Sequence, residues 1–78
     1  MTTFNVKLST IENVKDFVNI VSKYDYEIDL KSGRYVVDAK SIMGIFSLDL
    51  MNKIEVTVHS DECDDLMEEL ADMIVEEE

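Results

Sequence analysis

A strand with one buried face is predicted near the amino terminus, where apolar side chains occupy every second position at Phe4, Val6 and Leu8. The spacing then changes to that of one helix face, with apolar side chains at Val14, Phe17, Val18 and Val21. Ser9 followed by Glu12 is a capping-box pattern. The sequence therefore predicts a strand over residues 4–8 and a helix that Ser9 caps.

The next segments have the spacing of a hairpin, a short helix, a fourth strand and a last helix. A Ser32-Gly33 turn separates the alternating residues 26–31 from the β-branched and aromatic residues 35–37. Ser41 is a candidate N-cap for the short helix that follows. A fourth strand is expected over residues 54–59, and Ser60 or Asp61 is expected to cap the last helix. The apolar stripe of that helix is Cys63, Leu66, Met67, Leu70, Met73 and Ile74.

The resulting order, strand-helix-strand-strand-helix-strand-helix, predicts the fold class. Right-handed crossovers carry the first strand to the second and the third to the fourth, which places the helices on one face of a small antiparallel sheet. We expect an α+β open-faced sandwich with a four-stranded antiparallel sheet and three helices on one face. With 78 residues, two glycines and no proline, the chain has no linker, so we expect one domain over residues 1–78.

Charge and composition exclude several classes of function. The formal net charge is −11, and residues 54–78 hold eleven acidic side chains and no lysine or arginine. Such a surface repels nucleic acid and anionic lipid, so we expect neither partner. No segment has the length of a signal peptide or a membrane span, which predicts a cytoplasmic protein. Cys63 and His59 are the only cysteine and histidine; we expect a buried thiol at Cys63, and no metal or cofactor.

The segment over residues 40–58, which begins Lys-Ser-Ile-Met-Gly-Ile-Phe-Ser-Leu, carries a resemblance. It is similar to the regulatory serine segment of the HPr family, the histidine-containing phosphocarriers of the phosphotransferase system, in its Gram-positive form. The family pattern runs roughly K-S-I-M-G-(V/I)-(M/F)-S-L-G-I, without a gap against this chain. The resemblance covers about the last 55 residues well, and the first strand and helix match in pattern alone.

The resemblance implies a role for Ser41 and for the short helix after it. Ser41 corresponds to the serine that HPr kinase phosphorylates, with Lys40 as the nearest cation; the residues alone leave a plain N-cap as the alternative. The apolar side chains of Ile42, Met43 and Phe46 correspond to the surface that partner proteins bind. Core packing with incidental exposure is the alternative for these three.

The residue that defines the family's carrier activity has no counterpart at the expected place. In the family, the loop after the first strand carries a phosphorylatable histidine, with an arginine two residues later. Here the loop is about five residues shorter, and Thr10 and Glu12 stand in those two places. Neither side chain can relay a phosphoryl group as an imidazole does. His59 ends the fourth strand, and an antiparallel pairing with the first strand places it at the end of the sheet away from Thr10.

These observations predict a regulatory or partner-binding HPr-like protein, not an enzyme, that lacks histidine phosphocarrier activity and is a candidate for phosphorylation on Ser41. Its partner would be a protein of the phosphotransferase system or its regulation. The alternative is a small structural or protein-interaction domain of the same fold, unrelated to sugar phosphotransfer, that uses the apolar patch of Ile42, Met43 and Phe46. Self-association as a homodimer stays open in both cases, with residues 35–37 as an exposed strand.

Overall fold

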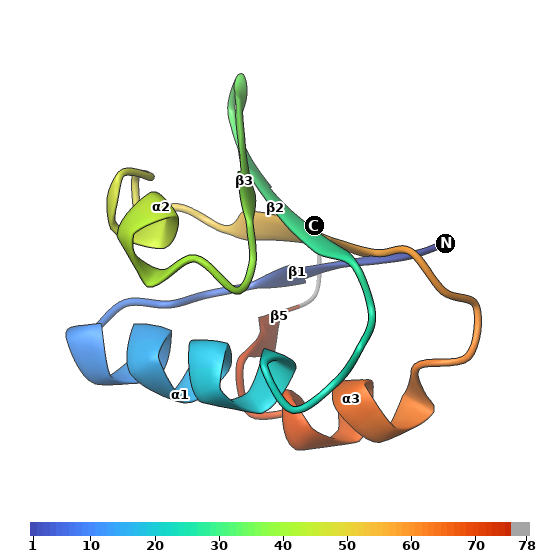
Figure 1. Cartoon of the computed structure of the whole chain (residues 1–78). Helices are drawn as coiled ribbons and strands as arrows, with labels where there is room; N and C mark the ends of the chain where they lie inside the picture. The colour runs from blue at the N-terminus through green and yellow to red at the C-terminus, as the bar shows by residue number, and fades with distance from the viewer. Residues whose placement is uncertain (76–78) are drawn as a thin grey trace.

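Among the residues that the structure describes, five strands form one antiparallel sheet, and three helices pack against one face of it (Figure 1). The computed structural model describes residues 1–75. The strands are β1 (Thr2–Val6), β2 (Ile28–Ser32), β3 (Tyr35–Asp38), β4 (Ile54–Val58) and β5 (Ile74–Val75). The helices are α1 (Ile11–Val21), α2 (Ile42–Phe46) and α3 (Asp64–Glu69). The predicted α+β class, with antiparallel strands and three helices, is confirmed.

The strand order is β3-β2-β4-β1-β5, which makes the prediction of four strands wrong by one. In the centre of the sheet, Thr2 lies opposite Val58 and Val6 opposite Ile54. The fifth strand pairs with the other side of β1, where Val6 lies opposite Ile74. A strand at a sheet edge exposes unpaired N–H and C=O groups, and β5 satisfies part of that edge.

The last helix is shorter than predicted and begins later. Its apolar stripe continues to Ile74, but α3 ends at Glu69 and the chain turns to reach β1, where the Met73 carbonyl accepts a hydrogen bond from the Lys7 N–H at 3.0 Å. The residue at the N-cap is Cys63, without a side-chain hydrogen bond, and not Ser60 or Asp61. Those two are held at the end of the sheet, because Thr2 donates to the Ser60 carbonyl and the chain's amino group pairs with Asp61.

The cap of α1 is Thr10 and not Ser9. Thr10 has an extended backbone, and its hydroxyl oxygen accepts the Asn13 N–H at 3.0 Å. The helix begins at Ile11, so Ser9 lies one residue too early to cap it, and the reciprocal bond that a Ser9–Glu12 capping box requires does not form.

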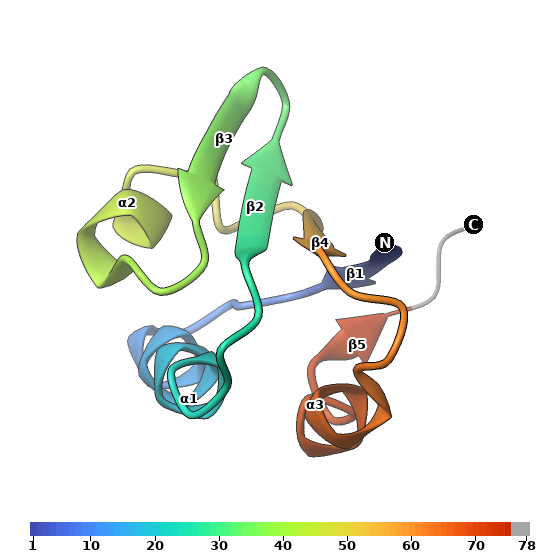
Figure 2. The same cartoon turned by 45° about the vertical axis from the view of Figure 1, so that its right-hand side comes forward.

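The core lies between the sheet and the helices. It takes the apolar side chains of the alternating strand positions and of the predicted helix faces; its largest fully buried members include Phe17, Leu8, Leu30, Ile45, Ile54, Leu66 and Leu70. Cys63 is buried with them, as predicted. Figure 2 shows α1 and α3 side by side beneath the sheet, with α2 beside β3.

Two glycines shape the region around α2. Gly33, at φ 60°, forms the first central position of the tight β2–β3 turn, as the Ser32-Gly33 pattern predicts. Gly44 lets α2 approach β3 closely, because a Cβ atom built at Gly44 would lie 3.3 Å from Cβ of Val37 and 3.1 Å from Oγ of Ser41. The absence of a side chain at residue 44 therefore sets the position of α2 and of the serine that begins it.

Candidate functional site

Ser41 begins α2, as the sequence predicts. Its backbone is extended, and its Oγ accepts a hydrogen bond from the Gly44 N–H at 3.2 Å while its carbonyl accepts one from the Ile45 N–H at 3.0 Å. The side chain is exposed. The Ser41 hydroxyl thus acts as an N-cap through one oxygen lone pair, and its exposure leaves it accessible to another protein.

Lys40 precedes Ser41, but its ammonium group is held elsewhere. Its Nζ donates to the Tyr24 carbonyl at 2.6 Å, and its backbone N–H donates to Oδ1 of Asp38 at 2.8 Å. These contacts tie the start of α2 to the connection between α1 and β2. A phosphate on Ser41 would gain this cation only if Lys40 released the Tyr24 carbonyl.

The same connection is anchored to α3 by two stacked tyrosines. The rings of Tyr24 and Tyr26 lie 5.7 Å apart, and the Tyr24 hydroxyl donates to Glu69. That hydrogen bond, followed by partial desolvation and the negative charge of Glu69, raises the pKa of Tyr24 to about 12. Hydrogen bonds from Lys23 and Tyr24 lower the pKa of Glu69 below its usual value. The connection between α1 and β2, whose Tyr24 carbonyl bonds to Lys40, therefore also contacts α3 in the acidic last third of the chain.

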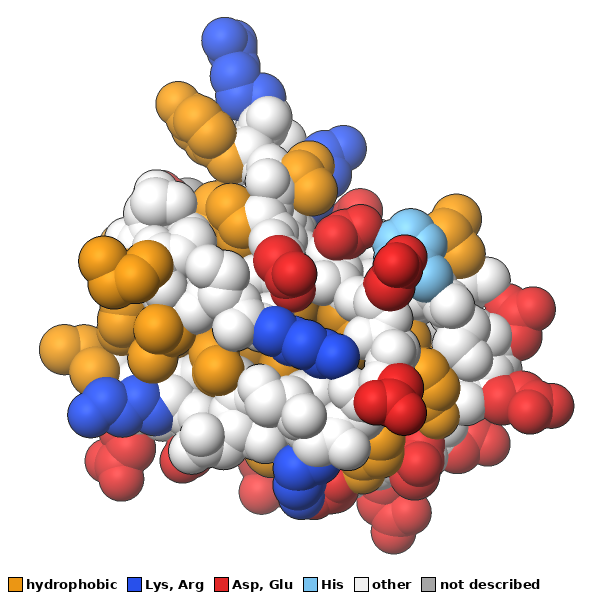
Figure 3. All heavy atoms as spheres, in the orientation of Figure 1, with side chains coloured by type: hydrophobic (Ala, Val, Ile, Leu, Met, Phe, Trp, Pro, Cys, Tyr) orange, Lys and Arg blue, Asp and Glu red, His pale blue; other side chains and the backbone are white. Residues whose placement is uncertain are grey.

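The predicted partner-binding residues divide into exposed and half-buried side chains. Met43 is 77% exposed and Phe46 40%, whereas Ile42 is half-buried and packs on the core. Ile11, which the sequence analysis did not single out, is 64% exposed. Hydrophobic side chains gather over α2 and the start of α1 (Figure 3). We call Ile11, Ile42, Met43 and Phe46 the α1–α2 patch.

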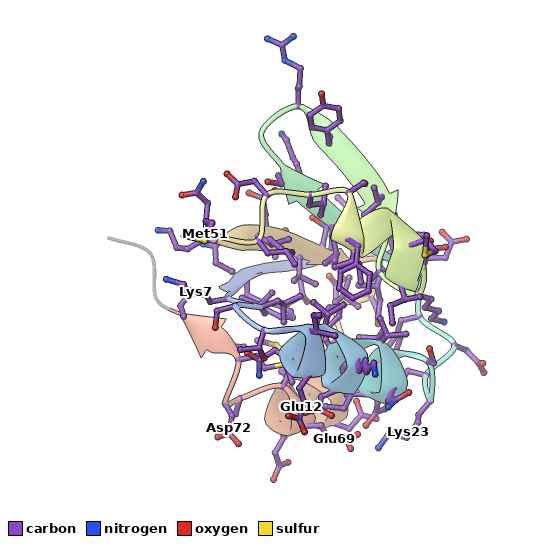
Figure 4. The ribbon with its side chains drawn as sticks, turned by 90° about the vertical axis from the view of Figure 1, so that its left-hand side faces the viewer. Lys7, Glu12, Lys23, Met51, Glu69 and Asp72 are labelled. Carbon is purple, nitrogen blue, oxygen red and sulfur yellow. The ribbon has the colours of Figure 1, made fainter. Side chains whose placement is uncertain are left out.

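The spacing of apolar residues did not predict that Ile11 is exposed, because Ile11 lies three residues before Val14, on the same helix stripe as the buried side chains. It is exposed because it is the first residue of α1, beyond the edge of the core. Met51 is 83% exposed, but it does not extend this patch, because it lies on the same side of the molecule as Lys7 and away from α2 (Figure 4).

Thr10 and Glu12, the predicted counterparts of the family's histidine and arginine, both lie at the start of α1. Thr10 is exposed, with its hydroxyl oxygen committed to the Asn13 N–H. Glu12 is exposed and lies on the side of α1 toward α3, away from α2 (Figure 4). Neither side chain offers a cation or a basic nucleophile to a phosphoryl group.

His59 lies at the other end of the sheet, as predicted. The pairing of Thr2 with Val58 puts His59 beside the amino terminus, while the loop to Thr10 leaves the sheet at Val6, opposite Ile54. Four strand residues, or about 13 Å, separate those two ends. The His59 Nε2 lies 2.8 Å from Oδ2 of Asp29, and its backbone N–H donates to the Glu27 carbonyl at 2.9 Å.

Neither a metal site nor a membrane-spanning helix is found in the described part of the chain. Among residues 1–75, no three side chains of His, Cys, Asp or Glu are arranged to hold a metal ion. No helix in that range is long and apolar enough to cross a membrane. The chemistry that the described residues offer is a serine hydroxyl at a helix start beside an exposed apolar surface.

Comparison with known families gives a match over most of the chain. The sequence profile of the family described as "PTS HPr component phosphorylation site" matches residues 12–76. The matched range includes Ser41 and the helix that it begins. It starts at Glu12, after the loop that contains Ser9 and Thr10.

Solved structures give the same result. HPr-C-His from Thermoanaerobacter tengcongensis is 25% identical, with a TM-score of 0.77, and the match covers 92% of this chain and 89% of that one. An HPr dimer from the same bacterium is 31% identical, with a TM-score of 0.63 over 76% of this chain and 70% of that one. The catabolite repression protein Crh of Bacillus subtilis, solved as a dimer with a swapped domain, is 19% identical over 91% of this chain and 88% of its own, with a TM-score of 0.65, and so shows the fold alone.

Proposed function

From the membership of this chain in the HPr family, which the match over residues 12–76 shows, we propose that it is a regulatory, partner-binding HPr that does not carry phosphate on histidine. One observation carries the proposal. His59, the single histidine of the chain, lies at one end of the sheet, and Thr10 lies at the other end. A phosphocarrier needs an imidazole at a place where backbone N–H groups and a cation share the charge of the phosphoryl group. At the start of α1 a threonine and a glutamate are present instead.

The loss of carrier activity is tested with phosphoenolpyruvate and the phosphotransferase that loads HPr proteins, using a histidine-bearing HPr as the positive control. We expect no acid-labile phosphoryl group on this protein under conditions that label the control completely. Because His59 is the only imidazole, the His59→Ala variant is the matched negative control. Labelling of the unmodified protein that His59→Ala abolishes would contradict the proposal.

Ser41 is the residue through which this protein would be regulated. A kinase would transfer the γ-phosphoryl group of ATP to the Ser41 oxygen, with ADP as the leaving group and the hydroxyl proton passing to the kinase. The product would place a phosphate at the positive end of α2, next to the Gly44 N–H, where it is compatible with the fold. It would also add charge beside the α1–α2 patch and so change which proteins bind there.

The phosphorylation is tested with HPr kinase and ATP, followed by intact-mass measurement. We expect one phosphoryl group on the unmodified protein, none on Ser41→Ala and one on Ser47→Ala. Ser47 is a matched control because it is an exposed serine at the other end of the same helix, where its hydroxyl donates to the Gly44 carbonyl. Modification that persists in Ser41→Ala would contradict the assignment.

A second candidate function is an interaction domain without a link to sugar phosphotransfer. The exposed α1–α2 patch favours it, because an apolar surface of this kind is typical of protein-binding sites and needs no kinase to act. The similar Thermoanaerobacter HPr solved as a dimer supports self-association in particular. The same kinase experiment separates the two functions, since an unchanged mass of the unmodified protein favours the second.

A further inference from the structure

The outermost strand of the sheet, β3, has a free backbone edge in the described part of the chain. Its ladder to β2 pairs Ser32 with Tyr35 and Asp29 with Asp38, and in the same register the Ala39 N–H donates to the Ile28 carbonyl at 3.0 Å. In an antiparallel ladder, bonded and non-bonded pairs alternate. Because the pair at Ala39 is bonded, the pairs at Val37 and Tyr35 are bonded too, and Val36 directs its N–H and C=O away from β2.

The side chains along this edge are apolar at the centre and oppositely charged at the ends. Val36 is 61% exposed and Tyr35 is 66% exposed. Arg34 precedes the strand and Asp38 ends it, and both are exposed. Neither belongs to any of the three ion pairs found among residues 1–75. Asp38 uses Oδ1 to accept the Lys40 N–H and keeps its charge available.

We infer that β3 pairs with β3 of a second copy of this chain, in an antiparallel register that places Val36 opposite Val36 of the partner subunit. This register follows from the positions of the charges, since it sets each Arg34 directly opposite Asp38 of the partner subunit and forms two ion pairs by symmetry. It also sets Tyr35 opposite Val37 of the partner subunit. The outward N–H and C=O of the two Val36 residues then bond to each other.

The distribution of charge over the molecule favours association of a second copy at this edge over association at most other parts of the surface. With a net charge of −11, two copies repel over most of their surfaces, but the acidic excess lies in residues 54–78. The β2–β3 hairpin projects from the body of the molecule, far from α3 (Figures 1 and 2). Figure 3 shows basic and hydrophobic side chains on this projection and most of the acidic side chains on the opposite side. Pairing through the hairpins keeps the acidic regions of two copies apart.

Sedimentation of the unmodified protein and two charge-reversal variants tests the inference. We expect a concentration-dependent monomer–dimer equilibrium for the unmodified protein. Arg34→Asp and Asp38→Lys each set like charges opposite each other in a homodimer, so each weakens dimerisation about 10- to 30-fold. An equimolar mixture of the two variants restores opposite charges at both ends and associates as tightly as the unmodified protein.

Recovery in the mixture also shows that both variants are folded, because the mixture contains only chains that associate poorly alone. A protein that stays monomeric at about 1 mM, the weak end of the affinity scale, would overturn the inference. So would dimerisation unaffected by either reversal, or a mixture that fails to recover while both variants keep the circular dichroism spectrum of the unmodified protein. A partner of another kind, such as a strand of a different protein, would leave this protein monomeric by itself.

Hydrogen exchange gives a residue-level test of the register. The Val36 amide should become protected as the protein concentration rises, while the Val37 amide, already bonded to β2, should exchange at one rate throughout. A dimer in which Val36 exchanges independently of concentration would refute edge pairing. These results do not depend on the proposed regulation, since the kinase and phosphoenolpyruvate experiments give their outcomes for a monomer or a dimer alike.

Discussion

Replacing Thr10 with alanine should lower the stability of the fold by about 1 kcal/mol, the usual cost of removing a hydroxyl N-cap. The Thr10 hydroxyl accepts the Asn13 N–H at 3.0 Å, and the Thr10 carbonyl accepts the Val14 N–H at 3.2 Å. The substitution removes the first bond and keeps the second. Because Thr10 is exposed, water can bond to the Asn13 N–H that is left, so the cost stays in the middle of the range for caps.

Ser9→Ala is the matched control for this change. Ser9 is the neighbouring exposed hydroxyl, and its only side-chain hydrogen bond in the described residues is a 3.5 Å contact with Oδ1 of Asn13, at the limit of hydrogen-bond length. We therefore expect Ser9→Ala to change the free energy of unfolding by less than about 0.5 kcal/mol.

Urea unfolding followed by circular dichroism measures both variants. Thr10→Ala should shift the midpoint with an unchanged slope, and it should lower Tm by about 4–8 °C for the expected 1 kcal/mol in a domain of this size. A loss of stability as large in Ser9→Ala as in Thr10→Ala, or a neutral Thr10→Ala, would refute the assignment. Such a result would indicate that Ser9 and Glu12 form a capping box.

Three further outcomes follow from the core and the tyrosine cluster. Phe17→Ala should cost about 3–5 kcal/mol in urea unfolding because Phe17 is fully buried, while Met51→Ala at an 83% exposed position should be close to neutral. In the folded protein, carbon NMR of Tyr24 Cζ should titrate near pH 12, and Glu69→Gln should move that midpoint down toward 10. The pKa of Tyr24 is raised in the folded state, so the contribution of Tyr24 to stability is fully present below about pH 10 and is lost as pH rises toward 12. Measurements of the free energy of unfolding across that pH range test this loss.

Most of the fold could be predicted because short-range spacing decides it. The alternation in β1 and β4 and the stripe of α1 match the faces that the structure buries. The Ser32-Gly33 pattern and the Ser41 cap are local as well, since they involve neighbouring residues alone. Gly33 has φ 60° in the turn, and the Ser41 hydroxyl accepts a hydrogen bond from the N–H three positions later. Local chemistry of this kind is present in the sequence itself.

The errors arose where a distant segment decided the outcome. Met73 and Ile74 fit the helix stripe of the last segment, and nothing in their spacing distinguishes a longer helix from a turn followed by a strand. The free edge of β1 favours the turn and strand. The Lys7 N–H bonds to the Met73 carbonyl and Val6 pairs with Ile74, where the backbone would otherwise bond to water. Likewise, the place of Ile11 on the stripe of α1 did not reveal that the core ends before it.

The separation of His59 from the start of α1 depends on the sense of one strand pair, and the order of elements determines that sense. The helical connection through α1 makes β2 run parallel to β1, the tight hairpin reverses β3, and the connection through α2 keeps β4 parallel to β3. Hence β4 must run opposite to β1, and a residue after β4 cannot lie at the end where Thr10 follows β1. Had β4 paired in parallel, His59 would stand beside Thr10, and the same composition would favour a phosphocarrier. The proposed loss of histidine phosphorylation therefore depends on topology, which makes the test with phosphoenolpyruvate a test of the fold's connectivity as well as of its chemistry.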